Sequence, residues 1–212
     1  MNIGGFLSLS LCDFPGKVAA VVFLNGCNFR CPWCHNGHLL RGEADPDYHE
    51  IPEDEVLSRL GELRNRLQGV VVTGGEPTLQ PGLHDFIVRL KALGLLVKLD
   101  TNGGRPEVVR ALLDEKLLDF VAMDVKAPWA KYAALTGLEA SPADRVRETM
   151  ALIAASGLPH QFRTTKVTPL LSEEDCAEIE RQIPPGSPFK WQTFIPDNAL
   201  DPALRAPAHG DA

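Results

Sequence analysis

Short apolar runs alternate along this chain with segments of helical periodicity. Six runs have the length and composition of buried β-strands: 18–24, 70–73, 95–100, 120–125, 161–167 and 189–194. Between them, apolar residues recur every three or four positions, as at Val56, Leu60 and Leu63, which is typical of amphipathic helices. Strands that alternate with helices pair in parallel, because each helix carries the chain back across the sheet. The alternation predicts an α/β fold whose sheet is either open and doubly wound or curled into a partial barrel.

Two more segments with helical spacing, 142–155 and 173–183, lie in the second half of the chain. Each begins with a Ser–Asp pattern that resembles an N-terminal cap, at Ser141 and Asp144 and at Ser172 and Asp175. A chain of 212 residues is long enough for one hydrophobic core, so we expect a single domain over residues 1–196. Residues 197–212 are rich in Ala, Pro and Asp, and we expect them to form a partly ordered tail.

The charge and the apolar content limit the partners and the location. The formal net charge is −7 and Lys and Arg form no run, which argues against a nucleic acid partner. No stretch approaches the roughly 18 uninterrupted apolar residues of a membrane span. Residues 1–26 also lack the charged start and apolar core of an export signal. We therefore expect a cytoplasmic protein that binds neither membrane nor nucleic acid.

Polar or glycine-rich segments follow three of the predicted strands, at 74–76, 100–103 and 124–126. In both candidate architectures the carboxyl ends of parallel strands meet at one edge, where functional residues collect. We expect the functional site at that edge.

Three of the five cysteines, Cys27, Cys31 and Cys34, lie within eight residues directly after the first predicted strand. The odd number and the missing export signal argue against a disulfide framework, so the cluster indicates a metal centre. Three thiolates leave one iron of a [4Fe-4S] cube without a protein ligand, and a substrate can bind at that iron.

A structural zinc site is the alternative, with His35 as the fourth ligand. Zinc ligands usually come as two separated pairs, whereas His35 is the immediate neighbour of Cys34 and no second C-x2-C follows. The spacing therefore favours the iron–sulfur cluster. Cys12 and Cys176 are isolated in the sequence, and we expect them to be structural.

Six segments, in order along the chain, carry a family resemblance: 13–17 (Asp-Phe-Pro-Gly-Lys), 25–36, 73–80, 98–103, 122–128 and 162–165. With these segments the chain resembles the radical S-adenosylmethionine (SAM) enzymes, and within them the activating enzymes of glycyl radical proteins. The resemblance is closest to the activating proteins of anaerobic ribonucleoside-triphosphate reductase, which also look like pyruvate formate-lyase activase. It implies a partial (β/α)6 barrel similar to a TIM barrel.

The resemblance also implies cofactors, partners and an activity. An electron from flavodoxin or ferredoxin enters the [4Fe-4S] cluster, and SAM is cleaved to methionine and a 5′-deoxyadenosyl radical. The radical abstracts a glycine hydrogen from a partner glycyl radical enzyme. Which enzyme is the partner and which carrier donates the electron are left open by the sequence.

The implied catalytic and metal-binding residues are Cys27, Cys31 and Cys34. The implied cofactor-binding residues are Trp33, His35, Gly74, Gly75, Glu76, Asp100, Asn102, Asp124 and Lys126.

Seven of these cofactor-binding residues have a chemical rationale. The two glycines allow close backbone approach to the methionine amine, beside which Glu76 is a negative neighbour. The two aspartates suit ribose hydroxyls, the ammonium group or a bound cation, and Lys126 suits the carboxylate. Trp33 either packs near the adenine or shields the cluster.

Three segments have weaker assignments. Residues 163–165 either contact SAM or are inward-facing polar residues of the barrel. The Pro-Gly of 13–17 is adequately explained as a turn. Ile195 stands where a charged residue or His is expected, which leaves a contact from that position in doubt.

Two other functions compete with the activase. One is a small-molecule radical SAM enzyme such as 7-carboxy-7-deazaguanine synthase, which shares the short chain and the cysteine triplet. The other is a noncatalytic zinc-binding module, which would be colourless where an iron–sulfur protein is brown.

Overall fold

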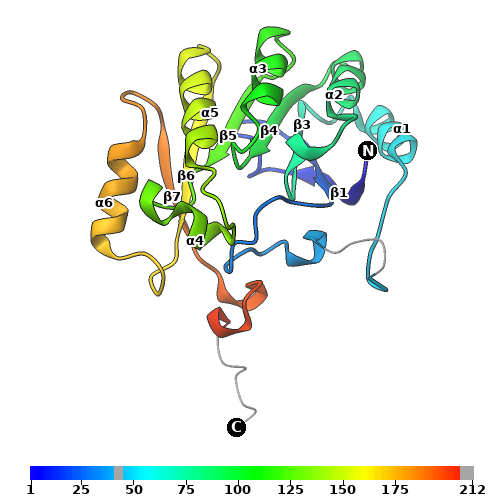
Figure 1. Ribbon diagram of the computed structural model, residues 1–212. Coiled ribbons are helices and arrows are strands. Elements are labelled where there is room, and N and C mark those ends of the chain that lie inside the picture. Colours follow the sequence, from blue (N-terminus) through cyan, green and yellow to red (C-terminus); the bar gives the residue numbers. More distant parts are fainter. Residues whose placement is uncertain (41–44, 206–212) are drawn as a thin grey trace.

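The computed structural model describes residues 1–40 and 45–205, and its centre is one seven-stranded sheet with the order β1-β2-β3-β4-β5-β6-β7 (Figure 1). The strands are β1 Ile3–Ser10, β2 Ala19–Leu24, β3 Gly69–Gly74, β4 Leu96–Thr101, β5 Phe120–Asp124, β6 His160–Lys166 and β7 Phe189–Thr193. β1 is antiparallel to β2, and every later neighbouring pair is parallel. The predicted α/β class with a mainly parallel sheet is confirmed.

The strand order distinguishes between the two predicted architectures. A doubly wound sheet needs a point where the strand order reverses, whereas here β2 to β7 follow one another in sequence. Because the connections between successive parallel strands all have the same handedness, the helices lie on one face of the sheet. The sheet then curls with the helices on its outer face. In the part of the chain described, β1 and β7 are the two edges of the sheet and do not pair with each other. The sheet is an open, partial barrel with six parallel strands.

The helices are α1 Glu53–Leu63, α2 Leu83–Ala92, α3 Pro106–Asp114, α4 Tyr132–Thr136, α5 Ala143–Ala155 and α6 Glu173–Gln182. Val70 and Val72 of β3 belong to the main core together with Leu60 of α1 and Phe86 of α2. The main core therefore lies between the sheet and its helices. None of the helices in the described residues is long and apolar enough to cross a membrane.

The structure differs from the sequence expectations in two local features. β1 was missed, because Gly4 and Gly5 weaken its strand pattern, although Leu7 and Leu9 alternate with serines. Ser172 forms the predicted capping box with Asp175. The predicted cap at Ser141 is displaced by one residue: α5 begins after Pro142, and the Ser141 hydroxyl accepts from the Ala143 amide at 3.3 Å rather than pairing with Asp144.

An apolar plug closes the amino-terminal end of the barrel interior. Phe14 is buried against Val21 and Val71, and its ring lies 6.1 Å from that of Phe120. Phe14 belongs to the loop before β2, so the plug lies at the opposite end of the strands from the loop that follows β2. Phe14 therefore closes this end of the barrel, and the exposed Pro15–Gly16 turn fits a structural role for residues 13–17.

Candidate active site

The three clustered cysteines lie on the loop that leaves β2 at its carboxyl end. Cys31 is buried, whereas Cys27 and Cys34 are partly exposed. All three line one cavity of about 390 Å³. Burial raises the pKa of Cys27, and it raises the pKa of Cys31 to about 12. Without a cationic centre the thiols of Cys27 and Cys31 are protonated at neutral pH, so a bound metal is what would favour their thiolates.

The carboxyl ends of five other strands, β3 to β7, form the opposite wall of the same cavity. The lining residues on these strands and the loops after them are Thr73, Gly74, Gly75, Glu76, Asp100, Thr101, Asn102, Asp124, Lys126, Arg163, Thr165, Gln192, Thr193 and Ile195. Every residue that the sequence proposed for the site lines this cavity, with Trp33 and His35 on the cysteine-loop side. Residues far apart in the sequence thus meet around one space.

Gly74 and Gly75 pack against the start of the cysteine loop. The Gly75 amide donates to Leu24 at 2.8 Å, and the Glu76 amide donates to the Gly26 carbonyl at 2.8 Å. A Cβ atom on Gly75 would lie 2.0 Å from that Gly26 oxygen, and one on Gly74, whose φ is +121°, would lie 2.2 Å from Leu24 N. Only glycine permits this approach, which joins the ends of β2 and β3. Asn36 adds a hydrogen bond of 3.2 Å to the Gly74 carbonyl.

Glu76 is fully buried, and its carboxylate is satisfied within the protein. It accepts hydrogen bonds from the Thr78 amide at 3.1 Å and hydroxyl at 2.5 Å. It also accepts from the Thr101 hydroxyl at 2.8 Å and the Asn102 amide at 2.7 Å. Burial raises the pKa of Glu76, and these hydrogen bonds act against that rise. The carboxylate therefore holds the end of β4 in place.

A chain of alternating charges crosses the barrel interior at the ends of β4, β5 and β6. Lys98 pairs with Asp100, and Arg163 bridges Asp100 at 3.2 Å and Asp124 at 2.8 Å. Lys126 pairs with Asp124 at 2.9 Å. This layer therefore holds three cations against two carboxylates. Lys126 and Arg163 are the cations of the layer that line the cavity, and they suit a ligand carboxylate.

Asp124 and Lys126 hold each other in their charged states. Burial would raise the pKa of Asp124, but Arg163 and Lys126 outweigh it and hold that pKa well below its usual range. Burial would lower the pKa of Lys126, but Asp124 and the Cys31 thiol raise it above its ordinary value. Both groups are ionised at neutral pH.

The described part of the C-terminal tail packs on the cysteine loop. The Asp201 amide donates to the Pro32 carbonyl at 2.8 Å, and Ala199 is fully buried. His35 stacks on Phe194, with ring centroids 5.9 Å apart. Residues 197–205 thus support the loop, and residues 206–212 of the predicted tail lie outside the described residues.

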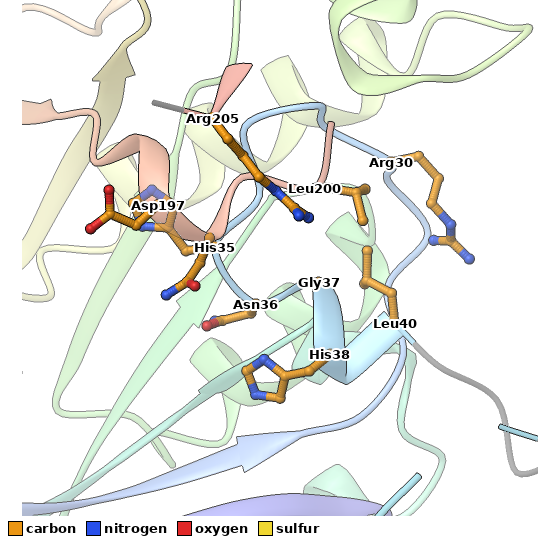
Figure 2. Close-up of a pocket in the computed structure, with 10 residues that line it drawn as sticks. Arg30, His35, Asn36, Gly37, His38, Leu40, Asp197, Leu200 and Arg205 are labelled. Atoms are coloured by element: carbon orange, nitrogen blue, oxygen red, sulfur yellow. The ribbon is translucent and has the colours of Figure 1, made fainter. Parts of the chain in front are cut away.

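A second, wider pocket of about 760 Å³ opens on the other side of the cysteine loop. Figure 2 shows it between residues 35–40 and the C-terminal segment, with the Arg205 side chain crossing the opening. His35, Asn36 and Leu40 line both this pocket and the inner cavity. The segment that follows Cys34 is therefore the wall between the two spaces.

The donor set fits a [4Fe-4S] cluster. Within the residues described, no three Cys, His, Asp or Glu side chains converge closely enough to surround a single metal ion. A four-iron cube does not need such convergence, because each cysteine binds a different iron. Three cysteines that share one cavity wall, opposite a charged wall, leave room for a ligand at the fourth iron.

Comparison with known proteins identifies the family. The model of the radical SAM superfamily matches residues 21–182. The chain belongs to the radical SAM superfamily. It is 34% identical over 205 residues to a Methanocaldococcus jannaschii protein named provisionally as a glycyl-radical enzyme activating enzyme, with 94% of this chain and 82% of that protein covered. This radical SAM protein is therefore an enzyme.

Other relatives of this radical SAM enzyme differ in function. It is 31% identical to the 7-carboxy-7-deazaguanine synthase of Hyperthermus butylicus, with 78% of this chain and 75% of that enzyme covered. It is also 31% identical to the pyruvate formate-lyase-activating enzyme of Staphylococcus aureus, over 56% of this chain and 50% of that enzyme. The solved structure of anSMEcpe with bound AdoMet superposes with a TM-score of 0.60 at 17% identity, over 85% of this chain and 54% of that one. That likeness supports the fold.

Sequence reasoning gave little weight to two contributors to this site. Arg163 was one of three residues left between two roles, and it is the cation that joins two of the aspartates. Lys98 was included only as part of a motif, and it is buried and paired with Asp100. A charged residue within an apolar strand pattern was the signal available for Lys98.

Proposed function

We propose that this protein is an activase that generates a glycyl radical on a partner enzyme. The observation that carries the proposal is the similarity to the M. jannaschii protein along almost the whole chain. Membership of the radical SAM superfamily implies a [4Fe-4S] cluster and SAM as cofactors. When bound, they supply a 5′-deoxyadenosyl radical, formed with methionine after one electron reaches SAM, and this radical takes a hydrogen atom from glycine.

The residues of the inner cavity have distinct roles in this proposal. Cys27, Cys31 and Cys34 hold the cluster. Lys126 and Arg163 attract the methionine carboxylate of SAM, because each is a cation at the cavity wall. Asp100 and Asp124 keep these cations in place and offer acceptors to the ammonium group or ribose hydroxyls.

The remaining predicted residues shape the space for SAM. Gly74 and Gly75 keep the cysteine loop against β3, which fixes the cluster relative to the charged wall. Glu76 orders the end of β4. Trp33 and His35 close the cavity on the loop side, near the position proposed for the adenine.

The size of the inner cavity favours a large substrate that approaches from outside. Pockets for one drug-sized ligand usually measure about 300–1,000 Å³, and this cavity of about 390 Å³ is near the lower limit. A cluster and SAM use that volume. That leaves little of this cavity for a second small molecule.

The proposed protein partners are a glycyl radical enzyme, with anaerobic ribonucleoside-triphosphate reductase as the first candidate, and flavodoxin or ferredoxin as the electron donor. The sequence resemblance supports the reductase over a lyase. A relative named pyruvate formate-lyase-activating enzyme keeps the lyase as the second partner to test.

The second candidate function is 7-carboxy-7-deazaguanine synthesis. The observation in its favour is the 31% identity to the H. butylicus synthase over three quarters of each chain. It is tested in a strain that lacks its own synthase, where restored production of 7-carboxy-7-deazaguanine would select this function.

The activase function is tested by adding the reconstituted protein, SAM and a reductant to purified anaerobic ribonucleotide reductase and, separately, to pyruvate formate-lyase. We expect a glycyl radical by electron paramagnetic resonance in one mixture. Deuterium in the partner's glycine should then appear in 5′-deoxyadenosine. Cleavage of SAM without a radical on either partner would direct the search to other substrates.

A further inference from the structure

Cys27 differs from the other two cysteines in its hydrogen bonds. The Phe29 amide lies 3.3 Å from the Cys27 sulfur, and the Nδ2 atom of Asn102 lies 3.8 Å from it. Both nitrogens carry hydrogen and lie within hydrogen-bond distance of the sulfur. In the described part of the chain, neither Cys31 nor Cys34 accepts a hydrogen bond from an N–H group at its sulfur. Cys27 alone thus receives donors from two segments, one of them beyond its own loop.

The orientation of the Asn102 side chain is fixed by its surroundings. Its Oδ1 atom accepts a hydrogen bond of 2.8 Å from the Gly104 amide, which requires the oxygen on that side. The NH2 group therefore faces the cysteine loop, where its nitrogen donates to Asn28 Oδ1 at 2.9 Å and to the Cys27 sulfur at 3.8 Å. Asn102 is only 5% exposed, so water does not compete well for these donors.

The backbone of Asn102 is fixed as well. Its amide donates to the buried carboxylate of Glu76 at 2.7 Å. The side-chain oxygen, the side-chain NH2 group and the backbone amide of Asn102 therefore all form hydrogen bonds within the protein. This arrangement leaves Asn102 no unused donor for SAM, although the sequence placed it among the SAM-binding residues.

An N–H donor to a cluster sulfur has a known electrostatic consequence. Adding an electron increases the negative charge on the ligands, and a hydrogen bond stabilises the more negative state. Hydrogen bonds to the sulfurs thus raise the reduction potential of an iron–sulfur cluster. The effect is strongest where the donor is buried and fixed, as Asn102 is.

We propose that Asn102 is a positioning residue that acts through Cys27 to raise the reduction potential of the cluster, and that it is not a SAM ligand. The inference rests on the cluster of the proposed function. It couples the segment after β4 to the cluster. Glu76 holds the backbone amide of Asn102, and the Gly104 amide holds the side-chain oxygen of the carboxamide that reaches Cys27.

The test is a redox titration of the reconstituted cluster in the full chain, followed by electron paramagnetic resonance, in wild type and three variants. Asn102→Ser shortens the side chain so that it no longer reaches Cys27, without adding charge. Asn102→Asp keeps the size and the acceptor for Gly104 but removes the donor. Asn28→Asp is the matched control, because it adds a charge beside Cys27 and leaves the Asn102 donor in place.

We expect a more negative midpoint potential in Asn102→Ser, and a larger negative shift in Asn102→Asp than in Asn28→Asp. The affinity for SAM with the oxidised cluster should stay within twofold of wild type in Asn102→Ser. An unchanged potential in Asn102→Ser, or equal shifts in the two aspartate variants, would overturn the proposal. So would a folded Asn102→Ser protein without iron, since Asn102 would then be needed for assembly.

The outcome for wild type separates this inference from the proposed function. A wild-type protein that holds no reducible cluster contradicts the proposed function itself. If the wild-type cluster is reduced reversibly and Asn102→Ser has the same midpoint potential, only the role of Asn102 is contradicted. Weaker SAM binding at an unshifted potential would restore Asn102 to the SAM site.

Discussion

Arg163 on β6 donates a hydrogen bond of 2.8 Å from Nε to the Asp124 carboxylate at the end of β5. The two residues are register partners in neighbouring parallel strands, so both side chains leave the sheet on its inner face. The same guanidinium reaches Asp100 on β4 at 3.2 Å. One cation therefore joins three strands at the edge that faces the cysteines, and Lys126 adds a second cation to Asp124.

Replacing Lys126 tests the charged wall. We expect Lys126→Ala to keep its iron but to bind SAM about tenfold more weakly or worse, because a charge-assisted hydrogen bond contributes about 1.5–3 kcal/mol. Equilibrium binding to the anaerobically reconstituted protein measures the change. Lys166→Ala is the control, because Lys166 pairs with Glu173 on the surface. Unchanged SAM affinity in Lys126→Ala would remove that lysine from the site.

Each of Cys27, Cys31 and Cys34 is predicted to be required for the cluster. Changing any one of them to Ala should abolish the iron–sulfur absorption and the cleavage of SAM. Cys176→Ala should retain both, since Cys176 is buried in α6 outside the cavity. Iron content and 5′-deoxyadenosine release measure these outcomes. Equal loss in Cys176→Ala would contradict the three-ligand assignment.

The sequence predicted most of the architecture, for identifiable reasons. The parallel strands β2 to β5 are mainly apolar, so their pattern was clear. β1 lies at the edge, and its Gly4–Gly5 pair and serines obscured it. The choice between an open sheet and a barrel depends on strand order, which local periodicity does not contain.

The candidate site was predictable in its residues but less so in their contacts. The positions after β3, β4 and β5 follow from the rule that parallel strands end at one edge. The roles of Glu76 and Asn102 did not follow from the sequence. Glu76 binds the Asn102 amide, about 25 residues further along the chain, and the Asn102 side chain reaches Cys27 on the cysteine loop. Arg163 meets Asp124 only when β5 and β6 pair in register.

Glu76 is predicted to stabilise the fold as well as the site. Glu76→Gln replaces one oxygen by an NH2 group and so places donors against donors in a fully buried position. We expect a loss of about 1–3 kcal/mol in the free energy of unfolding of the apoprotein, measured by urea denaturation. Glu173→Gln, at an exposed side chain, should change stability little. A Glu76→Gln protein as stable as wild type would contradict the hydrogen-bond assignment.

The stability of the apoprotein should depend on the ionisation of Asp124. Its pKa is depressed in the folded state and is about 3.9 when unfolded, so its contribution is complete above that value and is lost as the pH falls further. The difference in unfolding free energy between wild type and Asp124→Asn should therefore shrink between about pH 5 and pH 2. Urea unfolding across this range measures it.

Asp144→Asn is the control for the acid experiment, because Asp144 is 95% exposed and pairs only with Arg147 at the surface in the described structure. Its difference from wild type should stay nearly constant with pH. A constant difference for Asp124→Asn as well would mean that Arg163 and Lys126 do not depress the pKa of Asp124.

Electron paramagnetic resonance of the anaerobically reconstituted, reduced protein, with and without SAM, tests the radical SAM chemistry most directly. We predict a [4Fe-4S]+ signal that changes when SAM is added, together with the release of 5′-deoxyadenosine. A protein that holds stoichiometric zinc and no cluster, or a cluster whose signal ignores SAM, would contradict it.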